Sequence, residues 1–193
     1  MNWNQHSGLE GTHAFLSASG YHWLNYSDDK LVSVYNNKLA AQRGTKLHEL
    51  ASMCINMKQR LPRSDKALNA FVNDAITYRM QSEQILYFSM NCYGTADAIC
   101  FGKQKDSPKM LLRIHDLKTG DTPAKIAQLM IYAALFCLEY KIKPGEIDIE
   151  LRIYQGREVL FYNPKPEEIL PIMDTIVRFD RLIEKIKGQE GVV

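Results

Sequence analysis

The spacing of apolar residues changes abruptly in the middle of this chain, and that change limits its possible folds more than any other feature. Before the change, apolar side chains recur with helical spacing over residues 38–58, and a second helix is predicted to begin at Ser64, a good N-cap residue. After it, three short runs over residues 85–90, 95–101 and 110–118 predict strands. The chain is therefore expected to build a sheet after its first helices.

The second half of the chain continues to alternate between helices and strands. Thr122 suits an N-cap and Pro123 suits the first helical position, so a helix is predicted from there to about Lys141. Two strands and a closing helix are predicted over residues 147–154, 159–162 and 166–187. This order of elements predicts an α/β fold with a mixed central β-sheet flanked by helices.

The length of 193 residues suits one domain that is large enough to bury a core. A single domain is predicted over residues 1–193, with a peripheral N-terminal segment over 1–36 and a loose tail over 188–193. Within the N-terminal segment, residues 17–20 have the composition of a turn that leads into a short helix.

The apolar runs of the chain are too short for a membrane protein. A membrane-spanning helix needs roughly 20 apolar residues, and the longest run, Ile126 to Leu138, is interrupted by Gln128. The N-terminus, Met1 to Glu10, is polar and lacks the pattern of a signal peptide. These features predict a soluble, cytoplasmic protein with no membrane partner.

Net charge and cysteine content restrict the function less. The formal net charge is only +2, so binding to nucleic acid would depend on a local basic groove rather than on the overall charge. Four cysteines lie singly in apolar runs with no CxxC pair: Cys54, Cys92, Cys100 and Cys137. They are predicted to be buried free thiols rather than ligands of zinc or of an iron–sulfur cluster.

Two acidic residues and a lysine are predicted to meet where two neighbouring strands lie side by side. Side chains alternate between the faces of a strand, so Asp116 and Lys118 share one face and Leu117 points to the other. An antiparallel register centred near residues 106–107 would set Asp97 of the preceding strand opposite Asp116. Two carboxylates and an ammonium group would then lie together at one end of an apolar surface.

Adjacent buried carboxylates repel each other unless a positive charge lies between them, and a divalent cation is a natural partner. Hard oxygen ligands suit Mg²⁺ or Mn²⁺, which would polarise a phosphodiester and lower the pKa of a bound water. Lys118 could then orient that water or stabilise the charge that develops on the phosphate. The alternative is that Asp116 and Lys118 form an ordinary surface ion pair and that Asp97 is structural.

Further candidates come from the helices on either side of these strands. His48 could add a nitrogen ligand, which would favour Mn²⁺, although a lone histidine is more often an ordinary helix residue. Gln128 and Tyr132 are four positions apart and share one face of the helix after Lys118. They either point back at the site, to contact the lysine or a DNA phosphate, or form a partly exposed surface.

Short motifs occur in an order that resembles one nuclease family. They are residues 43–50 (RGTKLHEL), 94–97 (GTAD), 115–120 (HDLKTG) and 128–132 (QLMIY), with Ser17-Ala18-Ser19 and Trp23 near the start. Each motif alone is weak, but together and in this order they resemble the RecB-like branch of the PD-(D/E)xK nuclease superfamily. The resemblance covers roughly residues 15–140 and is greatest to phage exonuclease-like proteins, which are more distantly similar to lambda exonuclease.

The resemblance implies a restriction-endonuclease-like core and a role for each candidate residue. The ligands of Mg²⁺ or Mn²⁺ would be His48, Asp97, Asp116 and the backbone carbonyl of Leu117. Lys118 would be the catalytic lysine, and Gln128 and Tyr132 would match a QxxxY motif that supports the site and the DNA backbone. Asp116 stands where many members carry glutamate, a change that the family tolerates.

The function that this resemblance implies is a metal-dependent DNA exonuclease of phage recombination or replication, working in the host cytoplasm. Its partner would be DNA, while a recombinase, a single-strand-binding protein and a homo-oligomer stay open as further partners. Two alternatives also stay open: a structure-specific endonuclease, and a nuclease-fold DNA-binding accessory protein that does not cut. The modest net charge keeps the second alternative open.

Overall fold

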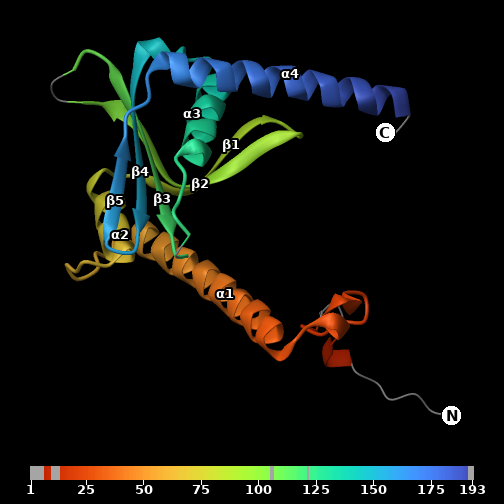
Figure 1. Ribbon diagram of the computed structural model, residues 1–193. Coiled ribbons are helices and arrows are strands. Elements are labelled where there is room, and N and C mark those ends of the chain that lie inside the picture. Colours follow the sequence, from red (N-terminus) through yellow and green to blue (C-terminus); the bar gives the residue numbers. More distant parts are fainter. Residues whose placement is uncertain (1–6, 10–13, 105–106, 121, 191–193) are drawn as a thin grey trace. The chain divides into compact units, whose positions relative to one another are not determined.

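The computed structural model describes residues 7–9, 14–104, 107–120 and 122–190, and its contacts divide the chain into two compact units, residues 1–43 and 44–193. The first unit contains the short 3-10 helices η1 (Ser7–Leu9) and η2 (Tyr21–Asn25) and the beginning of helix α1 (Asp28–Asn56) (Figure 1). Trp23 lies within η2, and its indole Nε1 donates a hydrogen bond to the carbonyl oxygen of Ser17 in the turn that precedes η2 (2.9 Å). The predicted turn and short helix are therefore present.

Helix α1 begins at Asp28, well before the predicted start near Lys38. The hydroxyl of Ser27 accepts a hydrogen bond from the backbone N–H of Lys30 (3.3 Å), and Asp28 and Asp29 place negative charge at the positive end of the helix dipole. Apolar spacing alone does not predict this start, because the buried residues of α1 all lie in its C-terminal half: Gly44, Ala51, Cys54 and Ile55.

The second unit is built on a five-stranded mixed sheet in the order β1-β2-β3-β4-β5. The strands are β1 (Gln81–Ser89), β2 (Cys92–Lys103), β3 (Met110–Lys118), β4 (Ile147–Gln155) and β5 (Glu158–Tyr162). Strands β3 and β4 are parallel and are joined by a crossover through helix α3 (Ala127–Tyr140), whereas the other neighbouring strands are antiparallel. All five predicted strands are present, and β1 begins earlier than predicted, at Gln81 rather than Ile85.

Helices cover both faces of this sheet (Figure 1). The C-terminal part of α1 and helix α2 (Ala67–Thr77) form one core with the sheet, in which Phe71, Leu117 and Tyr154 are fully buried. Helices α3 and α4 (Pro166–Glu190) form the other core, around residues such as Leu112, Leu129, Leu151 and Ile169. The predicted α/β arrangement of a mixed sheet flanked by helices is confirmed.

Two predicted helix starts are wrong, and in each case side-chain hydrogen bonds hold the backbone before the observed start. Helix α2 begins at Ala67 and not at Ser64, whose hydroxyl instead accepts a hydrogen bond from the N–H of Lys66 (3.3 Å). Helix α3 begins at Ala127 and not at Thr122 or Pro123. The side chain of Gln155 donates to the carbonyl oxygens of Gly120 (2.5 Å) and Thr122 (2.8 Å) and accepts from the N–H of Ala124 (3.1 Å), which holds this segment outside the helix.

The C-terminal helix and the cysteines also differ from expectation. Helix α4 continues through Gly188 to Glu190, so the chain after Gly188 is not a loose tail as far as the structure describes it. All four cysteines are free, but burial is complete only for Cys54 and Cys137, while Cys92 and Cys100 are half-buried. None of the helices formed by the described residues is both long and apolar enough to cross a bilayer.

Candidate metal centre

The sheet register brings Asp97 and Asp116 next to each other on neighbouring strands. Strands β2 and β3 pair with Ala98 opposite His115, and one further step along this register sets Asp97 opposite Asp116. The carboxylate Oδ2 of Asp97 accepts a hydrogen bond from the backbone N–H of Leu117 (2.9 Å), which ties Asp97 to the strand of Asp116. This is the register that strand alternation predicts.

Asp116 is buried, with a side chain only 3% exposed, and Lys118 Nζ lies 3.1 Å from its Oδ1 and 3.0 Å from its Oδ2. The hydrogen bond goes to Oδ1, so the buried Oδ2 has no hydrogen-bond donor among the residues that the structure describes. Burial, and then the charge of Asp97, raise the pKa of Asp116 above its usual value. An ordinary surface ion pair would expose both partners, so the burial of Asp116 argues against that interpretation.

Helix α3 supplies the contacts that hold Lys118. Lys118 Nζ donates to the side-chain oxygen of Gln128 (2.8 Å), and the Gln128 amide donates to the hydroxyl of Tyr132 (3.0 Å). The Tyr132 ring packs directly on Gly94 of β2, where an added Cβ would lie 2.8 Å from Tyr132 Cε1. Gln128 and Tyr132 therefore face the site and connect Lys118 with the strand that carries Asp97.

His48 reaches the same place from α1. Its Nδ1 lies 3.3 Å from Asp97 Oδ2, and this contact is the main reason that the pKa of His48 is raised. One ligand atom each from His48, Asp97 and Glu83 lie within 4.8 Å of one another. An imidazole nitrogen and two carboxylates at this spacing could hold a divalent cation.

Glu83 is a member of this group that the sequence does not predict. Strands β1 and β2 pair Ser82 with Ala98 and Gln84 with Ala96, so Glu83 lies opposite Asp97. Its φ is +50°, a conformation that costs energy for a residue with a side chain and that concentrates at functional sites. Burial raises the pKa of Glu83, and the charge of Asp97 raises it further. Only the pairing of β1 with β2 identifies this residue, because no local motif surrounds it.

Glu83, Asp97 and Asp116 thus occupy one row across three adjacent strands, with His48 beside Asp97 and Lys118 beside Asp116. Asp116 is not part of the group whose ligand atoms all lie within 4.8 Å of one another, which consists of His48, Glu83 and Asp97. Burial, and then the charge of Asp97, raise the pKa values of Glu83 and Asp116, and the hydrogen bond with Asp97 raises that of His48; a cation bound among these groups would favour the charged carboxylates. Oxygen donors with one nitrogen, and a buried carboxylate oxygen without a donor in the described parts of the chain, suit Mg²⁺ or Mn²⁺.

Two close contacts hold the elements of this centre together. Gly44 of α1 packs on Thr119, directly after Lys118, and an added Cβ would lie 2.7 Å from Thr119 Oγ1. The side chain of Leu117 is buried on the opposite side of β3, in the core formed with α1 and α2. Both the strand end and the helix that carries His48 are therefore fixed by packing.

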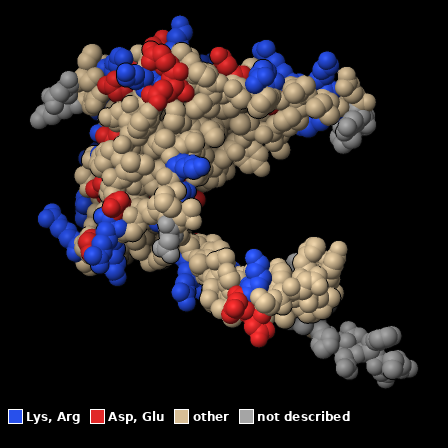
Figure 2. Space-filling view, viewed as in Figure 1, with Lys and Arg blue, Asp and Glu red and all other residues tan. Residues whose placement is uncertain are grey.

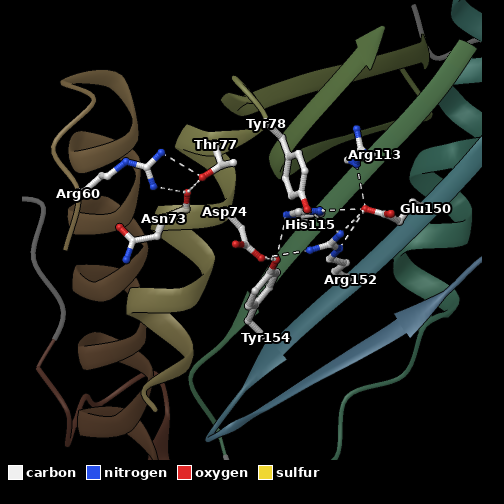
Figure 3. A network of polar contacts seen from close by, with 10 residues as sticks. All are labelled: Arg60, Asn73, Asp74, Thr77, Tyr78, Arg113, His115, Glu150, Arg152 and Tyr154. Atoms are coloured by element: carbon white, nitrogen blue, oxygen red, sulfur yellow. Dashed lines mark hydrogen bonds and ion pairs between the residues drawn. The ribbon is translucent and has the colours of Figure 1, made fainter. Parts of the chain in front are cut away.

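A polar network lies between α2 and the strands β3 and β4 (Figure 3). The Tyr154 hydroxyl donates its single proton to Asp74 (2.7 Å), so it must accept from His115 Nδ1 (3.2 Å). Burial lowers the pKa of His115, while Glu150, whose Oε1 lies 3.8 Å from His115 Nε2, acts in the opposite direction. Arg152 bonds to Asp74 (3.1 Å) and to Glu150 (2.9 Å). These hydrogen bonds connect α2 with strands β3 and β4.

Comparisons with known proteins give no family for this chain. No family model matches it, and no curated protein does. One similar solved structure is described as "Crystal structure of SSO0001"; it is 9% identical, covers 70% of this chain and 85% of that chain, and has a TM-score of 0.31. That likeness is too weak to support an assignment, so the function has to be inferred from the residues of the site.

Proposed function

We propose that this chain is a metal-dependent nuclease of the PD-(D/E)xK superfamily with a restriction-endonuclease-like core, acting as a DNA exonuclease in phage recombination or replication. The observation that carries the proposal is the pairing of Asp97 with the buried Asp116 on adjacent strands, with Lys118 hydrogen-bonded to Asp116. The motif order and the contacts of Gln128 with Lys118 and Tyr132 support it.

The cation would be Mg²⁺ or Mn²⁺. Asp97 would hold it together with His48 and Glu83, whose ligand atoms lie within 4.8 Å of one another and of Asp97. Asp116 and the backbone carbonyl of Leu117 would be the further ligands that the family resemblance implies. When bound, such a cation polarises a phosphodiester and lowers the pKa of a coordinated water. Glu83 extends the ligand set that the family resemblance implies.

Lys118 would act on the phosphate or on the attacking water. Its ammonium group is half-exposed and is held between Asp116 Oδ1 (3.1 Å) and Gln128 (2.8 Å), so its position does not depend on substrate. A positive charge fixed beside the scissile phosphate stabilises the negative charge that develops in the transition state. Gln128 and Tyr132 would be positioning residues, because they act through the lysine.

Degradation of linear duplex DNA with Mg²⁺ or Mn²⁺ tests the proposal. The wild-type chain is expected to degrade it, and Asp116→Ala and Lys118→Ala to lose this activity. Asp174→Ala and Lys185→Ala, which make the same changes at exposed positions of α4, are expected to keep it. Activity that survives both site changes would contradict the proposal, as would tight DNA binding without cleavage in either metal, which favours the accessory protein.

Covalently closed circular DNA separates the two kinds of nuclease. A strict exonuclease needs an end and leaves the circle intact, whereas a structure-specific endonuclease would open it. Cleavage of the circle by the wild-type chain, lost in Asp116→Ala, would replace the exonuclease with the endonuclease.

A further inference from the structure

Basic side chains collect where α2 begins, beside the sheet edge that carries the candidate metal centre. Strands β3 and β4 are parallel with Lys118 opposite Gln155, so both strands end at this edge. The β4–β5 turn follows at once, and its Gly156 carbonyl accepts a hydrogen bond from the N–H of Ala67 at the start of α2 (3.0 Å). Arg157 in the turn and Lys66 before α2 are thereby held close to the end of β3.

These cations are exposed to solvent. Arg157 is 82% exposed, and its ion pair with Asp65 (3.0 Å), itself 61% exposed, is weakened by water and salt. Arg63 and Lys66 are also exposed, and neither has an ion-pair partner within the described parts of the chain. Figure 2 shows Lys and Arg side chains gathered over the end of this unit where α2 and the β4–β5 turn lie. The low net charge of the chain thus hides a local concentration of positive charge.

The segment before α2 is fixed to that helix by hydrogen bonds. The Asn73 side chain accepts from the backbone N–H of Leu61 (2.9 Å) and donates to its carbonyl oxygen (2.9 Å). Asn69 donates to the carbonyl oxygen of Pro62 (2.8 Å). Residues 60–66 therefore form a fixed rim along α2, which we call the α2 rim, and its basic residues are held in place before any ligand arrives.

The α2 rim also borders a polar hollow. A depression of about 680 Å³ between the rim and α2 is lined by Arg60, Arg63, Asn69 and Thr77, among others. The guanidinium of Arg60 donates to the carbonyl oxygen of Asn73 (3.2 Å) and to the hydroxyl of Thr77 (3.0 Å), so it lies along the helix. Arg63, by contrast, has no such bond among the described residues and can turn toward a ligand.

We propose that Arg63, Lys66 and Arg157 bind the phosphate backbone of duplex DNA beside the candidate metal centre. The proposal rests on the proposed function for its substrate. Helix α2 rises about 1.5 Å per residue, and phosphates of one strand follow each other about every 3.4 Å along the duplex axis. The rim runs from Leu61, beside Asn73, to Lys66 at the start of α2, a stretch of roughly 10 Å along the helix that matches neighbouring phosphates of one strand. Contacts of this kind position the duplex without reading its sequence.

The salt dependence of DNA binding tests this surface directly. The rim variant is Arg63→Gln, Lys66→Gln, Arg157→Gln, and the control is Arg178→Gln, Arg181→Gln, Lys185→Gln on α4, which removes the same charge from exposed positions. Binding of a short blunt duplex is measured by fluorescence anisotropy from about 50 to 200 mM NaCl, with Ca²⁺ in place of Mg²⁺ to prevent cleavage. The slope of log Kd against log salt is expected to fall by about 2.7 in the rim variant, because each phosphate contact contributes about 0.9. The control is expected to keep the wild-type slope.

Several results would overturn the proposal: an unchanged slope in a folded rim variant, an equal loss in the control, or a loss seen with duplex RNA but not with duplex DNA. Circular dichroism establishes that each variant is folded. If the triple change unfolds the chain, the single variant Lys66→Gln is measured instead, because no described residue bonds to the Lys66 side chain. Its salt slope is expected to be smaller than that of the wild type by about 0.9, and an unchanged slope would overturn the proposal.

The binding assay is independent of turnover, so it separates this proposal from the proposed function. Hydrolysis of bis(p-nitrophenyl) phosphate with Mn²⁺, present in the wild type and absent in Asp116→Ala, tests the metal centre alone. A wild-type chain that hydrolyses neither this ester nor DNA would contradict the proposed nuclease function. The salt slope would still show whether the α2 rim binds DNA.

Discussion

Asp116 is a buried carboxylate whose only ion pair among the described residues is with Lys118. Lys118 Nζ lies 3.0 Å from its Oδ2 but hydrogen-bonds to its Oδ1, and burial followed by the charge of Asp97 raises the pKa of Asp116. A carboxyl whose pKa is raised in the folded state stabilises the protein below the unfolded pKa, and this contribution is lost as the pH rises through the folded pKa. The metal-free protein is therefore destabilised by Asp116 at neutral pH and above.

Asp116→Asn is accordingly expected to stabilise the metal-free protein while it abolishes nuclease activity. The amide oxygen can still accept from Lys118, and the buried charge is gone, so the gain at pH 8 should be on the order of 1 kcal/mol. The gain should shrink toward zero as the pH falls below the raised pKa of Asp116. Urea unfolding in EDTA at several pH values measures it. A variant that is less stable than the wild type at pH 8 would contradict this account.

Glu83 makes a second prediction, about metal affinity. Glu83→Gln is expected to weaken Mn²⁺ binding on the order of tenfold or more, because it removes a ligand, while Glu146→Gln at an exposed position should not. Affinity should also fall in acid, because the contact with Asp97 raises the pKa of His48 and a protonated imidazole cannot bind a cation. Thermal shift with increasing Mn²⁺ at pH 8 and pH 6 measures both effects, and equal shifts for both glutamine variants would remove Glu83 from the site.

Lys118 should affect chemistry without affecting the cation. Lys118→Ala is expected to lower kcat on the order of a hundredfold to ten-thousandfold, the range for a group that acts in the transition state. Stabilisation by Mn²⁺ should remain, about 2.7 kcal/mol at a hundred times the Kd. Gln128→Ala should lower kcat less, because it only loosens the lysine. Loss of Mn²⁺ stabilisation in Lys118→Ala would mean that the lysine mainly supports the fold.

At the level of elements, two glycines of strand β2 differ in the space around them, so the same substitution at each should have different effects. Gly94→Ala would place a Cβ 2.8 Å from the Tyr132 ring, whereas Gly102→Ala meets nothing within 4 Å. Overpacking of this kind costs typically about 1–3 kcal/mol, so Gly94→Ala should be destabilised by that amount and Gly102→Ala should be nearly neutral. Chemical denaturation of both variants measures the difference. Equal stabilities would show that Tyr132 moves freely, and would weaken its role as support for Gln128.

The network that joins α2 to β4 sets the behaviour of the fold in acid. Burial alone would raise the pKa of Glu150, but its contact with His115 and the charges of Arg152 and Arg113 hold it at about 2. The stability that Glu150 provides is present above its unfolded pKa of 4.5 and is lost as the pH falls toward 2. Glu150→Gln should lose on the order of 3 kcal/mol at pH 7 and show a shallower acid transition, because it leaves two guanidinium groups without their carboxylate. Urea unfolding of both proteins between pH 7 and pH 2 measures this, and parallel acid transitions would contradict it.

Contacts that are local in sequence are predicted well, and contacts made by side chains from elsewhere are not. The register of Asp97 against Asp116 follows from counting across one short connection, and the contact of Gln128 with Tyr132 follows from helical spacing. The start of α3 fails because Gln155, far along the chain, bonds to the preceding backbone. The spacing of apolar residues and the preferences for capping residues do not include hydrogen bonds from a side chain so distant in sequence.

For the molecule as a whole, the sequence predicts the class of fold and most of the candidate site, but not its full extent. Glu83 joins the site only through the pairing of β1 with β2, and its positive φ is invisible in a residue type that rarely adopts it. The residues from Ile147 to Tyr154 alternate between apolar and polar, a pattern typical of a half-exposed strand, whereas β4 lies inside the sheet between β3 and β5 and is contacted by α2 and α3. Its polar positions are instead satisfied inside the molecule, as Arg152 is by Asp74 and Glu150.

The side chain of Gln155 hydrogen-bonds to the backbone that follows Lys118, and the carbonyl oxygen of the next residue, Gly156, accepts a hydrogen bond from the start of α2. The α2 rim and the candidate metal centre would therefore keep a fixed position relative to each other when a duplex binds. Any unpairing or bending needed to bring a strand end to the cation would have to occur in the DNA. Ends rich in A·T pairs, which unpair more easily, should therefore be degraded faster than ends rich in G·C pairs.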